Sequence, residues 1–333
     1  MKAILATAPG NTDVLQLRDI PKPELATPHH LRVKLAAAGV NPVDTKLRAK
    51  PAYHPDKLPA ILGCDGAGIV EAIGNAVTRF KVGEEVFFCN GGLGDEPGNY
   101  AEYTTLHEDY CAKKPARMSL LESAALPLVF ITSWEALVER ANLQAGQAVL
   151  IHAGAGGVGH VAIQLARHLG ARVAVTVGDD KKAEFARSLG AEKTINYKSQ
   201  DFVQEALNWT EGKGVDVVYD TVGGETYLRS LNAARIGGKV VSLLSTPLSL
   251  AETQLARLRN LSLCYELMLT PQALGLDDQR IRQREMLEQA AALVDAGQLK
   301  VHVSHQLPLE QVAEAHKLIE AGGMIGKVIL TMN

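Results

Sequence analysis

The middle of the chain alternates short, almost wholly apolar runs with longer amphipathic stretches. Runs rich in β-branched residues at 148–151, 173–177, 215–219 and 240–244 indicate buried strands. Between the first two runs, apolar side chains recur with helical spacing from Val158 to Leu169. Buried strands that alternate with helices predict an α/β fold, a doubly wound parallel sheet covered on both faces.

The first third of the chain has a different pattern. Residues 31–35 alternate apolar and polar positions, which is typical of a half-buried strand. Glycine-rich strand patterns follow at 63–70 and 83–88. We therefore predict an irregular, mainly β domain here.

Beyond residue 270 the pattern predicts helices at 278–296 and 309–320 and strands at 301–303 and 327–330. The last two of these segments could rejoin the β domain. The predicted organisation is a mainly β domain made of residues 1–121 and 271–333, and an α/β domain made of residues 122–270.

Charge and cysteine content exclude several classes of protein. The 333 residues carry 34 Lys and Arg against 37 Asp and Glu, which argues against nucleic-acid binding or a polybasic membrane anchor. No apolar segment predicts a membrane span, and the N-terminus lacks the apolar core of a signal peptide. Four widely spaced cysteines predict neither a disulfide framework nor a structural zinc knuckle. We expect a cytoplasmic protein.

A glycine-rich turn carries the clearest chemistry. Gly154, Gly156 and Gly159 form a G-x-G-x-x-G motif between a strand pattern and a helix pattern. In that context the first glycine makes a tight turn, the second lets the backbone approach a pyrophosphate, and the third lets helix and strand pack closely. We predict that this turn binds a dinucleotide, with the remaining turn residues contributing as well: Ala155, Gly157 and Val158.

The end of the second strand indicates which dinucleotide binds. That strand ends in Thr176-Val177-Gly178, without the acidic residue that holds the ribose of NAD. Lys182 and Tyr197 could give a cation and a hydroxyl to a 2′-phosphate. Asp179 and Asp180 would repel that phosphate if they pointed inward, or could cap the following helix instead. The balance favours NADP.

Several motifs together resemble one enzyme family. They are the segments 39–46 (GVNPVDTK), 59–68 (PAILGCDGAG), 152–159 (HAGAGGVG), 191–197 (AEKTINY) and 326–330 (GKVIL). The chain resembles the medium-chain dehydrogenase/reductase superfamily, and within it the zinc-independent NADPH:quinone oxidoreductase and enoyl or alkenal reductase branch. The resemblance implies a GroES-like β domain, a Rossmann domain and a homodimer.

The resemblance also bears on zinc. Alcohol dehydrogenases of this superfamily hold a catalytic zinc ion through a Cys, a His and a second Cys. This chain has Asn41, Cys64-Asp65 and Leu128 near those positions. Because catalytic zinc needs three protein ligands, we predict that the chain binds no metal.

By resemblance, Asn41, Asp44 and Lys46 lie at the nicotinamide end of the cleft, with Lys46 as a donor to the substrate carbonyl. Tyr53 corresponds to a tyrosine suggested as proton donor or substrate anchor. Two alternatives stay open: Asn41-Pro42 could simply form a turn, and Lys46 could be a solvated helix charge.

Three further residues complete the predicted cofactor set. Thr132 could contact the cofactor or cap a helix, and Gly178 and Lys327 are assigned to the cofactor site. Many relatives carry an Arg or His shortly before the closing Gly-Lys, where this chain has residues 322–325 (GGMI). The resemblance therefore implies that a phosphate or substrate contact made in those relatives is lost in this chain.

These features predict an NADPH-dependent oxidoreductase acting on a small electrophile. Hydride would pass to a quinone or to the β-carbon of an α,β-unsaturated carbonyl compound, whose conjugation spreads the arriving charge. Two alternatives remain: a zinc-dependent alcohol dehydrogenase, and a non-catalytic protein that binds NADPH as a sensor or structural component.

Overall fold

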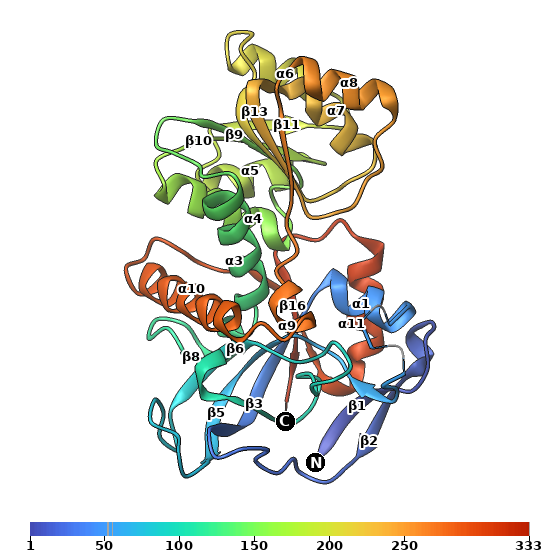
Figure 1. The fold of residues 1–333 in the computed structure, drawn as a ribbon, viewed down its shortest axis with the longest axis vertical. Helices are drawn as coiled ribbons and strands as arrows, with labels where there is room; N and C mark the ends of the chain where they lie inside the picture. The colour runs from blue at the N-terminus through green and yellow to red at the C-terminus, as the bar shows by residue number, and fades with distance from the viewer. Residues whose placement is uncertain (52, 55, 333) are drawn as a thin grey trace. The chain divides into compact units, whose positions relative to one another are not determined.

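Two compact units make up the chain in the computed structural model (Figure 1). One combines Met1–Leu128 with Leu269–Asn333, and the other is Val129–Met268. The structure describes residues 1–51, 53–54 and 56–332.

The second unit holds a six-stranded sheet whose strand order is β11-β10-β9-β12-β13-β14. All neighbouring strands in it pair in parallel. The strands are β9 (Ala148–Ile151), β10 (Arg172–Val177), β11 (Lys193–Asn196), β12 (Val215–Asp220), β13 (Ala234–Ser242) and β14 (Ser262–Tyr265). The predicted parallel sheet is confirmed.

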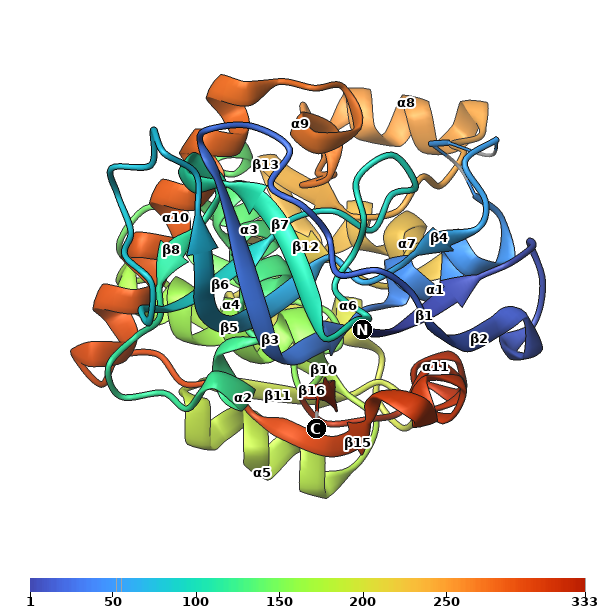
Figure 2. The same ribbon diagram turned by 90° about the horizontal axis from the view of Figure 1, so that it is seen from below.

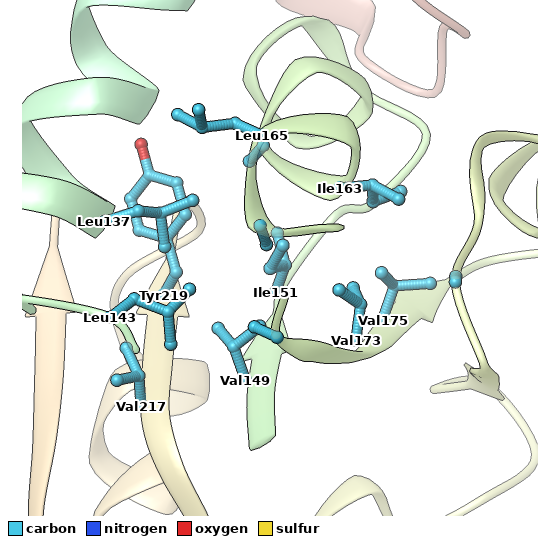
Figure 3. Close-up of a cluster of buried hydrophobic side chains, with 14 of the residues drawn as sticks. Leu137, Leu143, Val149, Ile151, Ile163, Leu165, Val173, Val175, Val217 and Tyr219 are labelled. Atoms are coloured by element: carbon cyan, nitrogen blue, oxygen red, sulfur yellow. The ribbon is translucent and has the colours of Figure 1, made fainter. Parts of the chain in front are cut away.

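Side chains of this sheet alternate between two apolar cores, one on each face. Val149 and Ile151 of β9 enter one core, which Figure 3 shows beneath Ile163 and Leu165 of the helix that follows. Leu150, between them, enters the other core. Because successive strand residues point to opposite faces, a strand buried on both sides must be apolar throughout. That requirement produces the continuous apolar runs.

Helices cover both faces of the sheet. In Figure 1 they lie around the strands of this unit: α4 (Gly157–His168), α5 (Asp180–Leu189), α6 (Phe202–Trp209), α7 (Glu225–Ala233) and α8 (Leu250–Leu258). Upstream, α3 (Pro127–Trp134) continues as a π-helical segment, Glu135–Arg140. The two segments together form one helical stretch over 127–140.

The strand order reverses between β9 and β12. From β9 the chain proceeds through β10 to β11 on one side, and from β12 through β13 to β14 on the other. Ligands of open α/β sheets bind at such a reversal, outside the carboxyl ends of the strands. The glycine turn follows β9 directly and lies at this place.

The first unit contains a three-stranded sheet, β2-β1-β4, and a seven-stranded sheet. Strands β3, β5 and β6 of the larger sheet can be followed in Figure 2. The strands are β1 (Lys2–Ala6), β2 (Leu15–Asp19), β3 (His30–Val40), β4 (Ala60–Ile61), β5 (Asp65–Ile73), β6 (Glu85–Cys89), β7 (Tyr103–His107), β8 (Ala112–Lys113), β15 (Val303–Pro308) and β16 (Lys327–Thr331). A mainly β domain is confirmed.

The C-terminal segment does rejoin this unit, because β16 pairs with β3 and β15 pairs with β16. Helices connect and cover the strands: α1 (Pro42–Ala49), α2 (Leu120–Ser123), α9 (Thr270–Ala273), α10 (Asp277–Asp295) and α11 (Val312–Ala321), with short 3₁₀ turns at Thr12–Val14, Glu108–Tyr110 and Leu309–Gln311. Among the described residues, no helix is both long and apolar enough to cross a membrane.

Candidate active site

The glycine turn leaves β9 through a left-handed residue, Ala153, whose φ is +51°. The Ala153 carbonyl accepts a hydrogen bond from the Gly156 N–H at 2.9 Å, and the Gly154 N–H donates to the Thr176 carbonyl at 3.0 Å. Helix α4 then begins at Gly157. Its first N–H groups and positive dipole end suit a pyrophosphate.

The three motif glycines differ in what a side chain would meet. A Cβ on Gly154 would lie 2.6 Å from the Val175 side chain, and one on Gly159 would lie 2.3 Å from the Ala153 carbonyl. On Gly156 it would meet only that carbonyl, at 3.2 Å. Packing therefore requires the first and third glycines, whereas a side chain at the second would need the Ala153 carbonyl to move by only a few tenths of an ångström.

The loop after β10 holds the residues predicted to bind a 2′-phosphate. Asp179 caps α5 by accepting the Lys182 N–H at 2.9 Å, so the capping alternative is confirmed. The Lys182 ammonium lies 3.2 Å from the other Asp179 oxygen. A Cβ on Gly178 would lie 3.1 Å from the Tyr197 hydroxyl and 3.5 Å from Lys198 Cε. The Tyr197 hydroxyl and the Lys198 side chain thus lie beside Gly178, and the Lys182 ammonium lies beside the next residue, Asp179.

Thr132 is buried inside α3 rather than at its end. Its carbonyl accepts a hydrogen bond from the Tyr219 hydroxyl at 3.3 Å. A helix-capping role for Thr132 is therefore wrong, because capping residues flank a helix. A contact with the cofactor stays a prediction.

In the first unit, a buried carboxylate collects distant parts of the chain. Asp65 Oδ1 accepts the Leu128 N–H at 2.7 Å, and Oδ2 accepts the Asn41 side-chain amide at 2.9 Å. The Lys327 ammonium donates to Asn41 Oδ1 and lies 3.4 Å from Asp65 Oδ2. All three side chains are at most 3% exposed. The ion pair holds the Asn41 amide in one orientation.

Asp44 forms a second buried carboxylate beside this pair. Its Oδ2 accepts the Asn41 backbone N–H at 2.8 Å and the Tyr100 hydroxyl at 2.9 Å, and the Cys64 thiol lies 3.8 Å from Oδ1. Burial raises the pKa of Asp44 to about 7, although the Asn41 and Tyr100 hydrogen bonds act to lower it. Asn41 and Asp44 do come together, inside the protein.

This raised pKa predicts a stability difference that depends on pH. The folded pKa of about 7 lies above the ordinary 3.8, so the contribution of Asp44 to stability is complete at low pH and is lost as pH rises through about 7. As pH rises from about 4 to about 7, we expect the unfolding free energy of wild type to fall relative to that of Asp44→Asn, by on the order of 4 kcal/mol in total. Denaturant titrations at several pH values measure it. Parallel pH curves for the two proteins would contradict it.

Tyr100 connects the Asp44 carboxylate to α11. The hydroxyl accepts from His316 Nε2 at 3.3 Å, and His316 Nδ1 accepts from the Arg48 guanidinium at 3.3 Å. Arg48 also binds Glu320 at 2.5 Å. Burial, followed by the Arg48 charge, lowers the pKa of His316 to about 3. Because the His316 ring is neutral, it connects α11 to Arg48 of α1 without placing a second positive charge beside that guanidinium.

The structure leaves the other two predicted catalytic residues outside this network. Lys46 is exposed on α1. Tyr53 is half-buried, and its pKa is raised by burial and then by the nearby Cys64. Its hydroxyl therefore keeps its proton at neutral pH. Both roles stay predictions.

The three positions compared above with zinc ligands do meet, around Asp65. Two of them, Leu128 and Asn41, offer N–H donors, where a zinc ion needs lone pairs. The Lys327 ammonium also lies there and would repel a metal cation. In the part of the chain that the structure describes, no three His, Cys, Asp or Glu side chains are placed to hold a metal ion. The residues present do not fit catalytic zinc.

Sequence reasoning missed several residues of these sites. Arg48 follows Asp44 by one helical turn on α1, which is a local signal that could have been used. Lys198 directly follows Tyr197 and could have been considered with it. Tyr100 and His316 join the network only through folding, and no local pattern marks them.

Two family models match the chain. An alcohol dehydrogenase GroES-like domain matches residues 27–116, and a zinc-binding dehydrogenase domain matches residues 189–330. The first match covers much of the first unit.

Curated relatives match nearly the whole chain. A quinone oxidoreductase of Pseudomonas aeruginosa is 33% identical over 99% of both chains. A 2-haloacrylate reductase of a Burkholderia species is 35% identical over 91% of both. Among solved structures, the Escherichia coli quinone oxidoreductase complexed with NADPH superposes with a TM-score of 0.88 at 30% identity, covering 99% of this chain and 100% of that one. The chain therefore belongs to the quinone oxidoreductase-like branch of the medium-chain dehydrogenase/reductase superfamily.

Proposed function

We propose that this protein is an NADPH-dependent oxidoreductase that reduces quinones or the C=C bond of α,β-unsaturated carbonyl compounds without zinc. The observation that carries this proposal is the glycine turn at the strand-order reversal, in which packing constrains Gly156 much less than Gly154 or Gly159. Relatives named quinone oxidoreductase and 2-haloacrylate reductase, one of them solved with NADPH, support the cofactor and both substrate classes.

Bound NADPH supplies a hydride, and the chain supplies binding and a proton. The turn at 154–159 would hold the pyrophosphate. Tyr53 is the proposed proton donor, because the resemblance singles out this tyrosine and its hydroxyl is protonated at neutral pH, so it can give its proton to a basic enolate or quinolate oxygen. Lys46 would stabilise the developing negative charge on the carbonyl oxygen, as preorganised donors do.

For the 2′-phosphate we propose Lys182, Tyr197 and, as an addition to the predicted set, Lys198. Asp179 supports this arrangement because it is occupied in capping α5 and in pairing with Lys182. The ion pair with Asp179 already holds the Lys182 side chain, so phosphate binding would cost little side-chain freedom.

Replacing Lys182 by Ala should weaken NADPH binding at least tenfold and leave NADH binding within about twofold of wild type, because only NADPH carries the phosphate that the ammonium would bind. Fluorescence titration of each reduced cofactor measures this. The exposed neighbour Lys181, changed to Ala, is the matched control. Equal losses for NADPH and NADH would contradict the assignment.

The substrate class is tested by following oxidation of NADPH with matched panels of quinones and of 2-alkenals and 2-haloacrylates. NADH serves as control, and each assay is repeated with a metal chelator. Turnover that survives the chelator supports the proposal and identifies the class. Turnover that the chelator abolishes favours the zinc-dependent alternative, and tight NADPH binding without turnover favours the sensor.

We also propose a homodimer. Strand β14 ends the sheet order, and apolar side chains near it are exposed: Ile236, Leu258 and Tyr265 are 67%, 82% and 52% exposed. An unpaired strand edge with apolar neighbours is a natural place for a second copy to pair. Light scattering coupled to gel filtration tests this, and a monomer mass would overturn it. The cytoplasmic location stays a prediction.

A further inference from the structure

His152 is the last residue before the glycine turn and is almost fully buried, with 1% of its surface exposed. Its ring lies between two hydroxyl groups. Nδ1 is 3.1 Å from Thr176 Oγ1 on β10, and Nε2 is 2.9 Å from Ser230 Oγ on α7. The Thr221 hydroxyl, just after β12, donates to the His152 carbonyl at 2.9 Å. His152 therefore connects the end of β9 with β10, α7 and the segment just after β12.

The hydrogen bonds that connect Ser230, His152 and Thr176 can be directed in only one way. Ser230 donates its hydroxyl proton to the Thr226 carbonyl at 2.7 Å, so its oxygen accepts from His152 Nε2–H. A neutral imidazole has one N–H, and Nδ1 must then accept from the Thr176 hydroxyl. Burial lowers the pKa of His152 to about 4, which keeps the ring in this neutral form.

Thr176 passes this arrangement on to the turn. The Thr176 hydroxyl donates a hydrogen bond to His152, and the same oxygen accepts one from the Ala153 N–H at 3.1 Å. The Thr176 carbonyl accepts the next N–H, from Gly154, at 3.0 Å. One residue thus holds two successive amides at the entrance to the turn.

The conformation of Ala153 needs such support. Its φ of +51° is a left-handed conformation that costs a non-glycine residue about 1–3 kcal/mol. Its carbonyl accepts from Gly156 and lies against Gly159, so the orientation of this peptide sets the rest of the turn.

We propose that His152 is a positioning residue for cofactor binding: through Thr176 and Ser230 it holds Ala153 left-handed and so fixes the N–H groups that receive the pyrophosphate. This inference rests on the proposed function in one respect, the placement of the pyrophosphate on this turn. It adds a residue that touches neither cofactor nor substrate.

The test measures equilibrium binding to the full chain carrying Thr176→Val or His152→Phe. The ligands are NADPH, NADH and adenosine 2′-monophosphate, which has no pyrophosphate. We expect NADPH and NADH to weaken by the same factor, at least fivefold, while adenosine 2′-monophosphate binds as it does to wild type. Thr176→Ser, which keeps the hydroxyl, should restore wild-type affinity.

Thr210→Val provides the matched control. Thr210 is also buried, and its Oγ1 accepts a backbone N–H, from Gly214, at 3.0 Å. It lies at the end of α6 rather than beside the turn, so the same chemical change there should leave all three affinities unchanged. A loss of equal size in Thr210→Val would overturn the inference, because the effect would be general destabilisation.

Two further outcomes overturn the proposal. One is NADPH affinity within twofold of wild type in both variants, and the other is an equal loss for adenosine 2′-monophosphate, which would show a merely structural role. Gly156→Ala separates this failure from failure of the proposed function. If that variant binds NADPH normally, the pyrophosphate does not lie on the turn; if it loses NADPH while the His152 and Thr176 variants do not, only the present inference fails.

Discussion

Replacing Gly156 by Ala is expected to weaken NADPH binding at least tenfold while changing the melting temperature by no more than about 2 °C. The backbone at Gly156 has a φ of −73°, which any residue can adopt, and an added Cβ would meet only the Ala153 carbonyl, at 3.2 Å. An alanine there needs that carbonyl to move by only a few tenths of an ångström, so the fold's own demand for glycine is small. A pyrophosphate close to the backbone would require it.

The matched controls are Gly154→Ala and Gly159→Ala in the same turn. Their Cβ atoms would lie 2.6 Å from Val175 and 2.3 Å from the Ala153 carbonyl. We expect both to lower the melting temperature by several degrees, because the turn and its neighbours must move. Fluorescence titration with NADPH and thermal unfolding of each variant measure the two effects separately. A stable Gly156→Ala protein with wild-type affinity would refute the placement of the pyrophosphate.

The parallel sheet was predictable because burial on both faces leaves a continuous apolar pattern that does not depend on the neighbours. The ends of its strands were less predictable. The run at 240–244 indicated a strand, yet β13 extends back to Ala234 through Gly237 and Gly238. Parallel pairing with β12, with a register shift near Val215 and Val217, holds that glycine segment extended. Pairing with β12 therefore determines where β13 begins, and no local sequence pattern contains that information.

Edge elements show the same limit. Strand β14 (Ser262–Tyr265) was not predicted, because an edge strand is buried less and its residues are mixed. The strand expected at 301–303 lies at 303–308, where pairing with β16 places it. In each case the partner strand supplies the missing information.

The candidate sites divide in a similar way. The glycine turn is contiguous in sequence, and its context could be checked from the strand and helix patterns on either side. The buried cluster joins residues 41, 65, 128 and 327, which no spacing rule connects. Motif resemblance singled out Asn41 and Lys327, but only the fold shows that they contact each other.

Lys327→Met is expected to lower the free energy of unfolding by about 3–5 kcal/mol. The Asp65 carboxylate is fully buried, and the Lys327 ammonium is the cation beside it, at 3.4 Å. Without that cation, a buried negative charge and the Asn41 carbonyl oxygen both lose a partner. Denaturant unfolding near neutral pH measures the loss. Exposed Lys34 of β3, changed to Met, should alter stability by no more than about 0.5 kcal/mol.

Adding Asp65→Asn to Lys327→Met should recover part of that loss, because the double variant buries no net charge. The Asn41 amide can then turn over and accept a hydrogen bond from the amide introduced at position 65, which replaces one of the two lost interactions. If the double variant is no more stable than Lys327→Met, charge balance is not what Lys327 provides.

The folded double variant also tests the predicted cofactor role of Lys327. NADPH affinity near wild type would assign this lysine to the buried ion pair alone, whereas a large loss would show that its ammonium contacts the cofactor.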